Sequence, residues 1–284
     1  MKLPLALLAA VAAAAFLGPV VLHAAFGLGT DDIDLLNRMS GQSALHPLGT
    51  DELGRDVLLR LLEGGRISLV IGIAAAIAAA AIGTAIGLAA GYLGGWTDRV
   101  LMRITDGMIA LPLLPLLIVL AALDLDKLGV PAALARSDDI SLIRIVALAV
   151  LIGWTTAARL VRGAALVTRN RDFVRAARSL GAGVPHILWR HILPNVLGPL
   201  IVATTLSAGD VILLESVLSF LGLGVQPPLA SWGSMLSNAQ ELVTSAPSLA
   251  VYPGLMIFLT VIAFNLLGDA LQNRLDPIGR SIAG

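Results

Sequence analysis

The sequence predicts an all-α, polytopic membrane protein with roughly six transmembrane helices. Of its 284 residues, 57% are hydrophobic and only 13% are charged, whereas soluble domains carry about 25% charged residues. The apolar residues gather in long stretches nearly free of Asp, Glu, Lys and Arg, and a helix needs about 20 such residues to cross a bilayer. Because backbone polar groups in lipid must be satisfied within the chain, these stretches are expected to be helices.

The composition also excludes several classes of protein. The chain has no cysteine, which excludes a disulfide scaffold, a zinc–thiolate site and a cysteine nucleophile. The large apolar content excludes a disordered chain. The 19 basic residues equal the 19 acidic residues in number, and a net charge of zero argues against nucleic acid as a partner.

Six stretches are the predicted spans, and they are residues 3–26, 67–93, 107–123, 145–158, 193–223 and 249–267. The fourth stretch is short, so we expect it to borrow turns from both flanks, with Arg144 and Arg159 snorkelling outward. The fifth is interrupted by Asp210 and Glu215. The many Ala and Gly residues suit close packing between helices in lipid.

The first stretch also resembles a cleavable signal peptide. Lys2 supplies a positive n-region, and residues 23–25 weakly resemble a cleavage site. However, the apolar run exceeds the about 7–15 residues typical of a signal peptide. We therefore expect the segment to remain as a membrane anchor.

The distribution of Lys and Arg predicts the orientation of the chain. With the N-terminus inside and six alternating spans, 12 of the 19 Lys and Arg residues fall in inner segments and 7 in outer ones. Positive residues are enriched in cytoplasmic loops. Both termini are therefore predicted to be cytoplasmic, as is the large loop between the fourth and fifth spans.

This large inner loop, about residues 159–192, is expected to contain two short helices joined by a glycine turn. Asp172 is a suitable N-cap for the first helix. Gly181 stands where a left-handed residue would end it. Pro185 fits the first turn of the second helix.

The basic residues of the loop have a plain interpretation. Arg171, Arg175 and Arg178 would line one face of the first helix, and a solvated basic face would satisfy the positive-inside rule.

The small residues of the loop are more specific. Two alanines are followed by a glycine and, further along, by a Leu-Pro pair. This arrangement resembles the EAA loop of the permease subunits of bacterial ATP-binding cassette (ABC) importers, in which a short coupling helix docks into a cleft of the ATPase subunit. The resemblance implies a coupling helix at about residues 172–180. The coupling residues that it implies are Asp172, Arg175, Ala176, Ala177, Arg178, Gly181, Leu193 and Pro194.

One position departs from the family pattern. Arg175 stands where the family usually has Glu. With Asp172 as N-cap, a Glu at this position would complete a capping box, which an arginine cannot do. We expect Arg175 instead to pair with an acidic group on the ATPase.

Three further strings, at residues 46–69, 212–233 and 268–277, resemble segments of the dipeptide/oligopeptide/nickel permease subfamily. With the inner loop, they extend the resemblance over roughly residues 46–280. The resemblance implies a type I ABC importer (MetI-like) permease fold. We divide the chain into residues 1–66, which hold an N-terminal transmembrane helix, an outer loop and an interfacial amphipathic helix, and residues 67–284, which hold a five-helix permease core with the coupling loop.

The amphipathic helix is predicted from the first of these strings. Asp51 and Glu52 favour a helix N-terminus. Val57 and Leu61 then contribute to an apolar stripe beside charged residues such as Arg60. This pattern is typical of a helix lying at a membrane surface.

The resemblance implies a permease subunit for di- and oligopeptides in the bacterial cytoplasmic (inner) membrane. Nickel, glutathione or another small solute is the alternative substrate. The implied partners are a second homologous permease subunit, two ATP-binding subunits, an extracytoplasmic solute-binding protein and membrane lipid. The chain has no Walker A pattern, so ATP and Mg are expected on the ATPase subunits. No enzymatic activity and no cofactor are expected in this chain.

Two other classes of function are less favoured. A stand-alone channel or secondary transporter would need intramembrane ion-binding residues or an inverted repeat. An intramembrane enzyme would need a His or Lys placed to activate Ser207 or Ser219. The four histidines lie in separate segments, so we expect no metal site.

Asp210 and Glu215 are the carboxylates placed well inside a span. Such groups are costly and usually face protein or water. Five residues separate them, which leaves them about 140° apart around a helix. We expect Glu215 to have a structural or gating role. Asp210 is expected either to line the pathway and touch a cationic group or to be a neutral, hydrogen-bonded residue inside the bundle.

Overall fold

The computed structural model describes the chain except for residues 28, 124–130, 132–137, 241, 243 and 276–284. The described residues contain no β-strand, only an isolated bridge between Thr50 and Asp56. The helices are α1 (Lys2–Phe26), η1 (Leu35–Asn37), α2 (Val57–Leu93), α3 (Gly95–Ala110), α4 (Leu113–Ala121), α6 (Asp138–Thr168), α7 (Asp172–Ser179), α8 (Val184–Ile187), the π-helical turn η3 (Leu188–Ile192), α9 (Leu193–Phe220), α10 (Trp232–Ala239) and α11 (Ser248–Leu275).

The predicted all-α membrane fold is confirmed. Within the described residues, five helical segments are long and apolar enough to cross a membrane, namely α1, α2, α6, the α8–η3–α9 run and α11. A sixth span results if the bent pair α3 and α4 is counted as one. The fourth predicted stretch does borrow turns from both flanks, because α6 runs beyond it in both directions.

The third predicted span is broken. The stretch 107–123 was expected to be one helix, but α3 ends at Ala110 and α4 continues at an angle of 86°. Proline has no backbone N–H to continue the ladder and disfavours helical backbone in the residue before it. Leu111, which precedes Pro112, is extended with ψ 138°.

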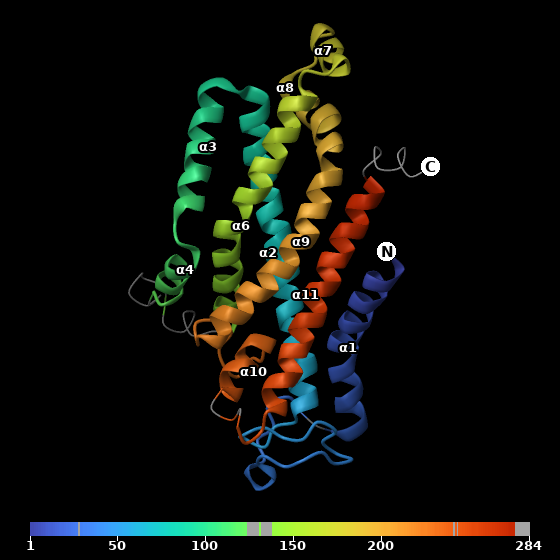
Figure 1. Ribbon diagram of the computed structural model, residues 1–284, viewed down its shortest axis with the longest axis vertical. Helices are drawn as coiled ribbons and strands as arrows, with labels where there is room; N and C mark the ends of the chain where they lie inside the picture. The colour runs from blue at the N-terminus through green and yellow to red at the C-terminus, as the bar shows by residue number, and fades with distance from the viewer. Residues whose placement is uncertain (28, 124–130, 132–137, 241, 243, 276–284) are drawn as a thin grey trace.

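Figure 1 shows a bundle with two distinct ends. The helices α7 and α8 lie at one end, together with the start of α3 and the last turns of α11. The helix α10 and the chain that joins α1 to α2 lie at the opposite end. This alternation follows the predicted order of inner and outer segments. We call the α7 end the coupling end and the α10 end the far end.

The helices α2 and α6 pack with almost no space between their backbones. Gly83, Gly87 and Gly91 recur every four residues along α2. A Cβ atom at Gly87 would lie 2.5 Å from the Ala158 carbonyl oxygen of α6. A Cβ atom at Gly91 would lie 2.7 Å from the Ala165 Cβ atom. Small residues allow this close approach, which drives helix association where lipid offers no hydrophobic effect.

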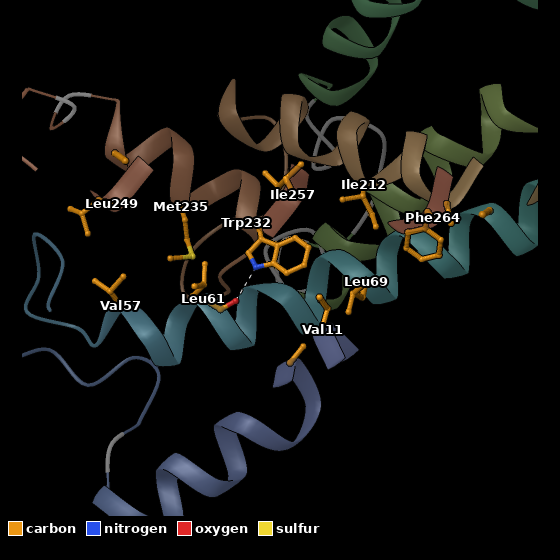
Figure 2. Close-up of a cluster of buried hydrophobic side chains, with 14 residues drawn as sticks. Val11, Val57, Leu61, Leu69, Ile212, Trp232, Met235, Leu249, Ile257 and Phe264 are labelled. Carbon is orange, nitrogen blue, oxygen red and sulfur yellow. Dashed lines mark hydrogen bonds between the residues drawn. The ribbon is translucent and has the colours of Figure 1, made fainter. Parts of the chain in front are cut away.

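The main core cluster forms around one tryptophan at the far end (Figure 2). Trp232 is fully buried, and its indole N–H donates to the Leu61 carbonyl 2.9 Å away. The ring is accommodated because Gly65 of α2 carries no side chain, and a Cβ there would lie 2.7 Å from the indole. Buried side chains from α1, α2, α9, α10 and α11 complete the cluster, among them Val11, Leu69, Ile212, Met235 and Phe264.

The segment predicted as a separate interfacial helix is instead the start of α2. The helix begins at Val57, not near Asp51, because the Asp56 carboxylate caps it by accepting the Leu59 N–H at 2.7 Å. Val57 and Arg60 are buried, with 1% and 4% exposure. The boundary drawn at residue 66 therefore falls inside a continuous helix.

Two ion pairs stabilise the buried guanidinium group of Arg60. The Arg60 guanidinium lies 3.3 Å from the Asp31 carboxylate and 3.6 Å from the Asp51 carboxylate. Asp51 also accepts the Arg55 Nε–H at 2.7 Å. The amphipathic pattern was correct, but folded chain rather than a membrane surface covers both of its faces.

Candidate functional site

The predicted coupling helix is present as α7, an eight-residue helix that spans Asp172–Ser179. Its N-cap is Arg171 rather than Asp172, which corrects the predicted start by one residue. Asp172 therefore occupies the first helical position, where a carboxylate still favours the positive end of the helix dipole. Arg175 lies one position further into the helix than the capping-box site, because its N–H bonds to the Arg171 carbonyl at 3.1 Å.

The end of α7 agrees with the prediction from Gly181. This residue has a left-handed φ of +83°. The Ala182 N–H bonds to the Ala177 carbonyl, and the Gly181 N–H bonds to the Arg178 carbonyl, both at 3.0 Å. This pair of bonds is a Schellman motif, which satisfies the carbonyls that a helix end leaves without partners. Glycine is favoured here because a left-handed backbone strains other residues.

Two side chains anchor α7 to the rest of the molecule. Val174 is fully buried in a cluster with Ile187 and Ile192. The Arg178 guanidinium lies 5.5 Å from the centre of the Tyr92 ring, and its Nη2 donates to the Tyr92 hydroxyl at 3.3 Å. The coupling helix is thus connected both to the end of α2 and to the chain that leads into α9.

Most of the other side chains of α7 are exposed. Arg175 and Ala176 are exposed and Ala177 is half-buried. Leu180, just beyond the helix, is 88% exposed, and Trp189 on η3 is 73% exposed. A surface of basic and large apolar residues remains for contact with another molecule.

The second short helix of the loop does not end before the fifth span. It continues through η3 into α9, which begins at Leu193 and has Pro194 in its first turn. Pro194 cannot donate a backbone hydrogen bond. The π-helical turn lies directly before it, and the Asn195 side chain donates to the His191 carbonyl at 2.7 Å. The second short helix of the loop and the fifth span are therefore one continuous helical run.

Asp210 lies on a groove in the membrane-spanning region. The groove has a volume of about 610 Å³ and is lined by α2, α4, α6 and α9. Most of its lining is apolar. Its polar side chains are those of Thr155, Thr156, Thr204, Ser207 and Asp210. The Asp210 side chain is exposed in the chain as described.

Glu215 lies elsewhere, in a buried hydrogen-bond network near the far end. It is 1% exposed, and its two carboxyl oxygens accept from the Ser68 hydroxyl at 3.1 Å and from the Ser219 hydroxyl at 2.6 Å. The Ser68 oxygen in turn accepts the backbone N–H of Trp232 at 3.2 Å. The Ser219 oxygen accepts the Val225 N–H at 3.0 Å. The Glu215 carboxylate is thus connected, through the hydroxyl groups of Ser68 and Ser219, to the backbone of the segment that carries α10.

The separation of Asp210 and Glu215 follows from the helix geometry predicted for them, since the two side chains leave α9 in different directions. Glu215 does not line the groove. Its partners Ser68 and Ser219 were not predicted as site residues. The sequence offers little reason to select these serines, because a lone serine in an apolar span does not reveal which helix it faces.

Two of the histidines lie together at the coupling end. The rings of His186 and His191 have centres 5.7 Å apart, and Phe173 packs beside His191. His46 is at the far end, where its Nδ1 lies 2.9 Å from the Asp56 carboxylate. No group of three or more His, Asp or Glu residues within the described part of the chain could hold a metal ion.

Comparisons with known proteins agree with one another. The family described as the binding-protein-dependent transport system inner membrane component matches residues 83–278. The glutathione transport system permease protein GsiD of Escherichia coli O157:H7 is 47% identical over 246 residues, which are 87% of this chain and 76% of that protein. The corresponding protein of Pectobacterium atrosepticum is 41% identical over 246 residues, with the same coverage of each chain.

A protein of Brucella suis biovar 1 that bears the name of a peptide permease is 41% identical over 249 residues, or 87% of this chain and 78% of that protein. Among solved structures, a crystal structure of an amino acid ABC transporter with histidines matches with a TM-score of 0.55. The match covers 76% of this chain and 94% of that chain at 15% identity. This likeness supports the fold alone.

Proposed function

This chain belongs to the family of inner membrane components of binding-protein-dependent transport systems, and from that premise we propose that it forms half of the translocation pathway of an ATP-driven importer for di- and oligopeptides, with glutathione as a candidate substrate. The observation that carries the proposal is the packing of α7, through its buried Val174, against the continuous helical run of α8, η3 and α9. It links an exposed helix suited to docking with the helix that carries Asp210.

The mechanism that we propose begins at α7. A second permease subunit completes the pathway, two ATPase subunits bind at the coupling end, and a binding protein delivers the substrate at the far end. ATP and Mg bind to the ATPase subunits, since this chain has no Walker A pattern. When the ATPase pair closes, it moves α7, and the buried packing of Val174 against Ile192 transfers the displacement to α9.

The groove supports a role for Asp210 in handling the substrate. It carries one carboxylate among four hydroxyl groups, and no basic side chain lines it. An ammonium group, such as the free amine of a peptide, would be attracted to this carboxylate where the dielectric constant is low. Peptides and glutathione both carry such an amine, whereas the groove offers a nickel ion only a single carboxylate.

The orientation is part of the proposal. The positive-inside rule supports a cytoplasmic coupling end and cytoplasmic termini. The absence of native cysteine allows a direct test. A membrane-impermeant thiol reagent should label S179C on α7 only from the cytoplasmic side and Q226C at the far end only from the outside. The opposite pattern would overturn the orientation.

The decisive experiment is reconstitution. The tagged chain should co-purify with ATPase subunits, and proteoliposomes containing the complex should take up a labelled peptide only with ATP and the binding protein. D210N should reduce uptake of peptides with a free amine more than uptake of N-acetylated peptides. Uptake by the isolated chain without ATPase would instead indicate a channel or secondary transporter.

A further inference from the structure

Only some of the charged residues of α3 form ion pairs with α6 among the described residues. The helix carries two acidic residues, Asp98 and Asp106, and both pair with arginines of α6. The Asp98 carboxylate receives two bonds from the Arg162 guanidinium, at 2.5 Å and 2.8 Å. The Asp106 carboxylate receives one from Arg159 at 2.6 Å. The acids of α3 therefore serve to attach it to α6.

The two arginines of α3 have a different environment. Arg99 and Arg103 are exposed, and within the described residues neither forms an ion pair. The Arg99 Nε–H makes only a long bond of 3.4 Å to the Gly95 carbonyl of its own helix. Trp96, which is 73% exposed, precedes them. Because each residue turns the helix by about 100°, Trp96, Arg99 and Arg103 fall within about 60° of one another.

The place of these residues in the fold matches a membrane interface. They occupy the first half of α3, which begins at the coupling end of the bundle and packs against α6 (Figure 1). Further along α3, toward the middle of the bundle, Ile104 and Ile109 are 54% and 46% exposed. The helix thus presents tryptophan and arginine near its end and apolar side chains deeper in the membrane.

We propose that Trp96, Arg99 and Arg103 form a binding surface for the phosphate headgroups of anionic phospholipids in the cytoplasmic leaflet. Tryptophan is favoured at the headgroup level of a bilayer. A guanidinium group binds phosphate through two parallel hydrogen bonds. Ile104, which is exposed next to Arg103 in the chain, lies where the acyl chains of the same lipids would run. An ATPase docked at α7 would contact the end of the bundle rather than this flank.

The proposal is independent of the transported substrate, although it adopts the orientation proposed above. The purified complex would be placed in nanodiscs of phosphatidylcholine containing increasing phosphatidylglycerol, and retained phosphatidylglycerol would be measured by native mass spectrometry. The double variant R99Q/R103Q should bind phosphatidylglycerol about thirtyfold more weakly, since each basic residue near an anionic surface contributes about 1 kcal/mol. R99K/R103K, which keeps the charge but loses the paired N–H donors, should bind phosphatidylglycerol more tightly than R99Q/R103Q and more weakly than the unmodified complex.

The matched control is R171Q/R190Q, which removes the same charge from two exposed arginines at the same end of the molecule but not from α3. It should leave phosphatidylglycerol retention within about twofold of the unmodified complex. Equal loss in both double variants would overturn the proposal, because the effect would then reflect total charge. Loss of a permease or ATPase partner from R99Q/R103Q would also overturn it, since a protein would then cover this face. Displacement of the lipid by inorganic phosphate at equal concentration would show a simple anion site instead.

Discussion

The molecule carries two eight-residue helices at its opposite ends, and they differ in how completely the chain surrounds them. The far-end helix α10 inserts Trp232 into the main core cluster, and the ring is fully buried. The coupling helix α7 buries only Val174 and is followed by Leu180, which is 88% exposed. The chain thus completes the environment of α10 by itself and leaves that of α7 open. The coupling role proposed for α7 requires a surface of this kind, which another protein can cover.

The hydrogen bonds show the same contrast. The segment that leads into α10 is bonded to α2 and α9 through Ser68, Ser219 and Glu215. Within the described residues, α7 has only the hydrogen bond from Arg178 to the Tyr92 hydroxyl and backbone bonds of its own. Four substitutions test whether the far end is a fixed support and the coupling end a docking surface.

The largest effect is expected at the centre of the far-end cluster. W232A should lower the free energy of unfolding by about 3–5 kcal/mol, because it leaves a large cavity and removes the indole hydrogen bond to the Leu61 carbonyl. The measurement is chemical or thermal unfolding of the purified chain in detergent. W189A at the coupling end is the matched control, and as a largely exposed tryptophan it should change stability by less than about 0.5 kcal/mol. Equal losses would remove the contrast between the two ends.

The second effect compares the two carboxylates of α9. E215L should destabilise the chain by about 1–3 kcal/mol, because the hydroxyls of Ser68 and Ser219 lose their buried acceptor. D210L should change stability by less than about 0.5 kcal/mol, since Asp210 makes no such network. Thermal unfolding of both variants in the same detergent provides the comparison. If D210L were the more destabilising change, Asp210 would be a structural residue rather than part of the pathway.

A smaller effect is expected at α7, where we propose that the ATPase docks. R175E should weaken binding of the ATPase subunits about two- to fivefold, as for the loss of one exposed ion pair. The stability of the chain itself should not change. Binding would be measured by titration of purified ATPase onto nanodiscs, with the far-end variant R38E as control. Assembly as good as that of the unmodified chain would exclude the pairing proposed for Arg175.

The smallest effect concerns the attachment of α7 to the bundle. R178Q removes the contact with the Tyr92 ring, which is worth about 0.5–1 kcal/mol at a partly exposed site. Hydrogen exchange of the amides of α7 should therefore become up to about fivefold faster, while α10 is unaffected. R171Q, which removes an arginine that stacks on no ring, should leave exchange in α7 unchanged. Faster exchange in both variants would indicate a general effect of charge.

Much of the coupling end could be predicted from the sequence because its signals are local. Gly181 ends α7 with the expected Schellman motif, and Pro185 lies in the first turn of the next helix. The error in the N-cap was one residue, because the choice between Arg171 and Asp172 depends on backbone geometry that a preferred residue type does not determine. The helix break before Pro112 was also local, but the apolar composition around it outweighed the proline in the prediction.

The far end could not be predicted in the same way, because its contacts join residues distant in the sequence. Ser68 and Glu215 are 147 residues apart, and Trp232 bonds to Leu61 across 171 residues. The first turns of α2 were taken for an interfacial helix because an amphipathic stripe looks the same whether lipid or protein covers it. Only the position of Asp31 and Asp51 beside Arg60 distinguishes the two.

By itself, the sequence determined that the chain is a helical membrane protein, roughly where its spans lie, and where the two short helices between the fourth and fifth spans lie. These properties depend on composition and on residues near one another in the chain, and lipid imposes helical backbone on any apolar segment that crosses it. The tertiary structure decided which carboxylate of α9 lies on the groove and which is bonded inside the bundle. That outcome depends on which helices pack together, and the glycines of α2 allow this packing at distances that only the folded chain reveals.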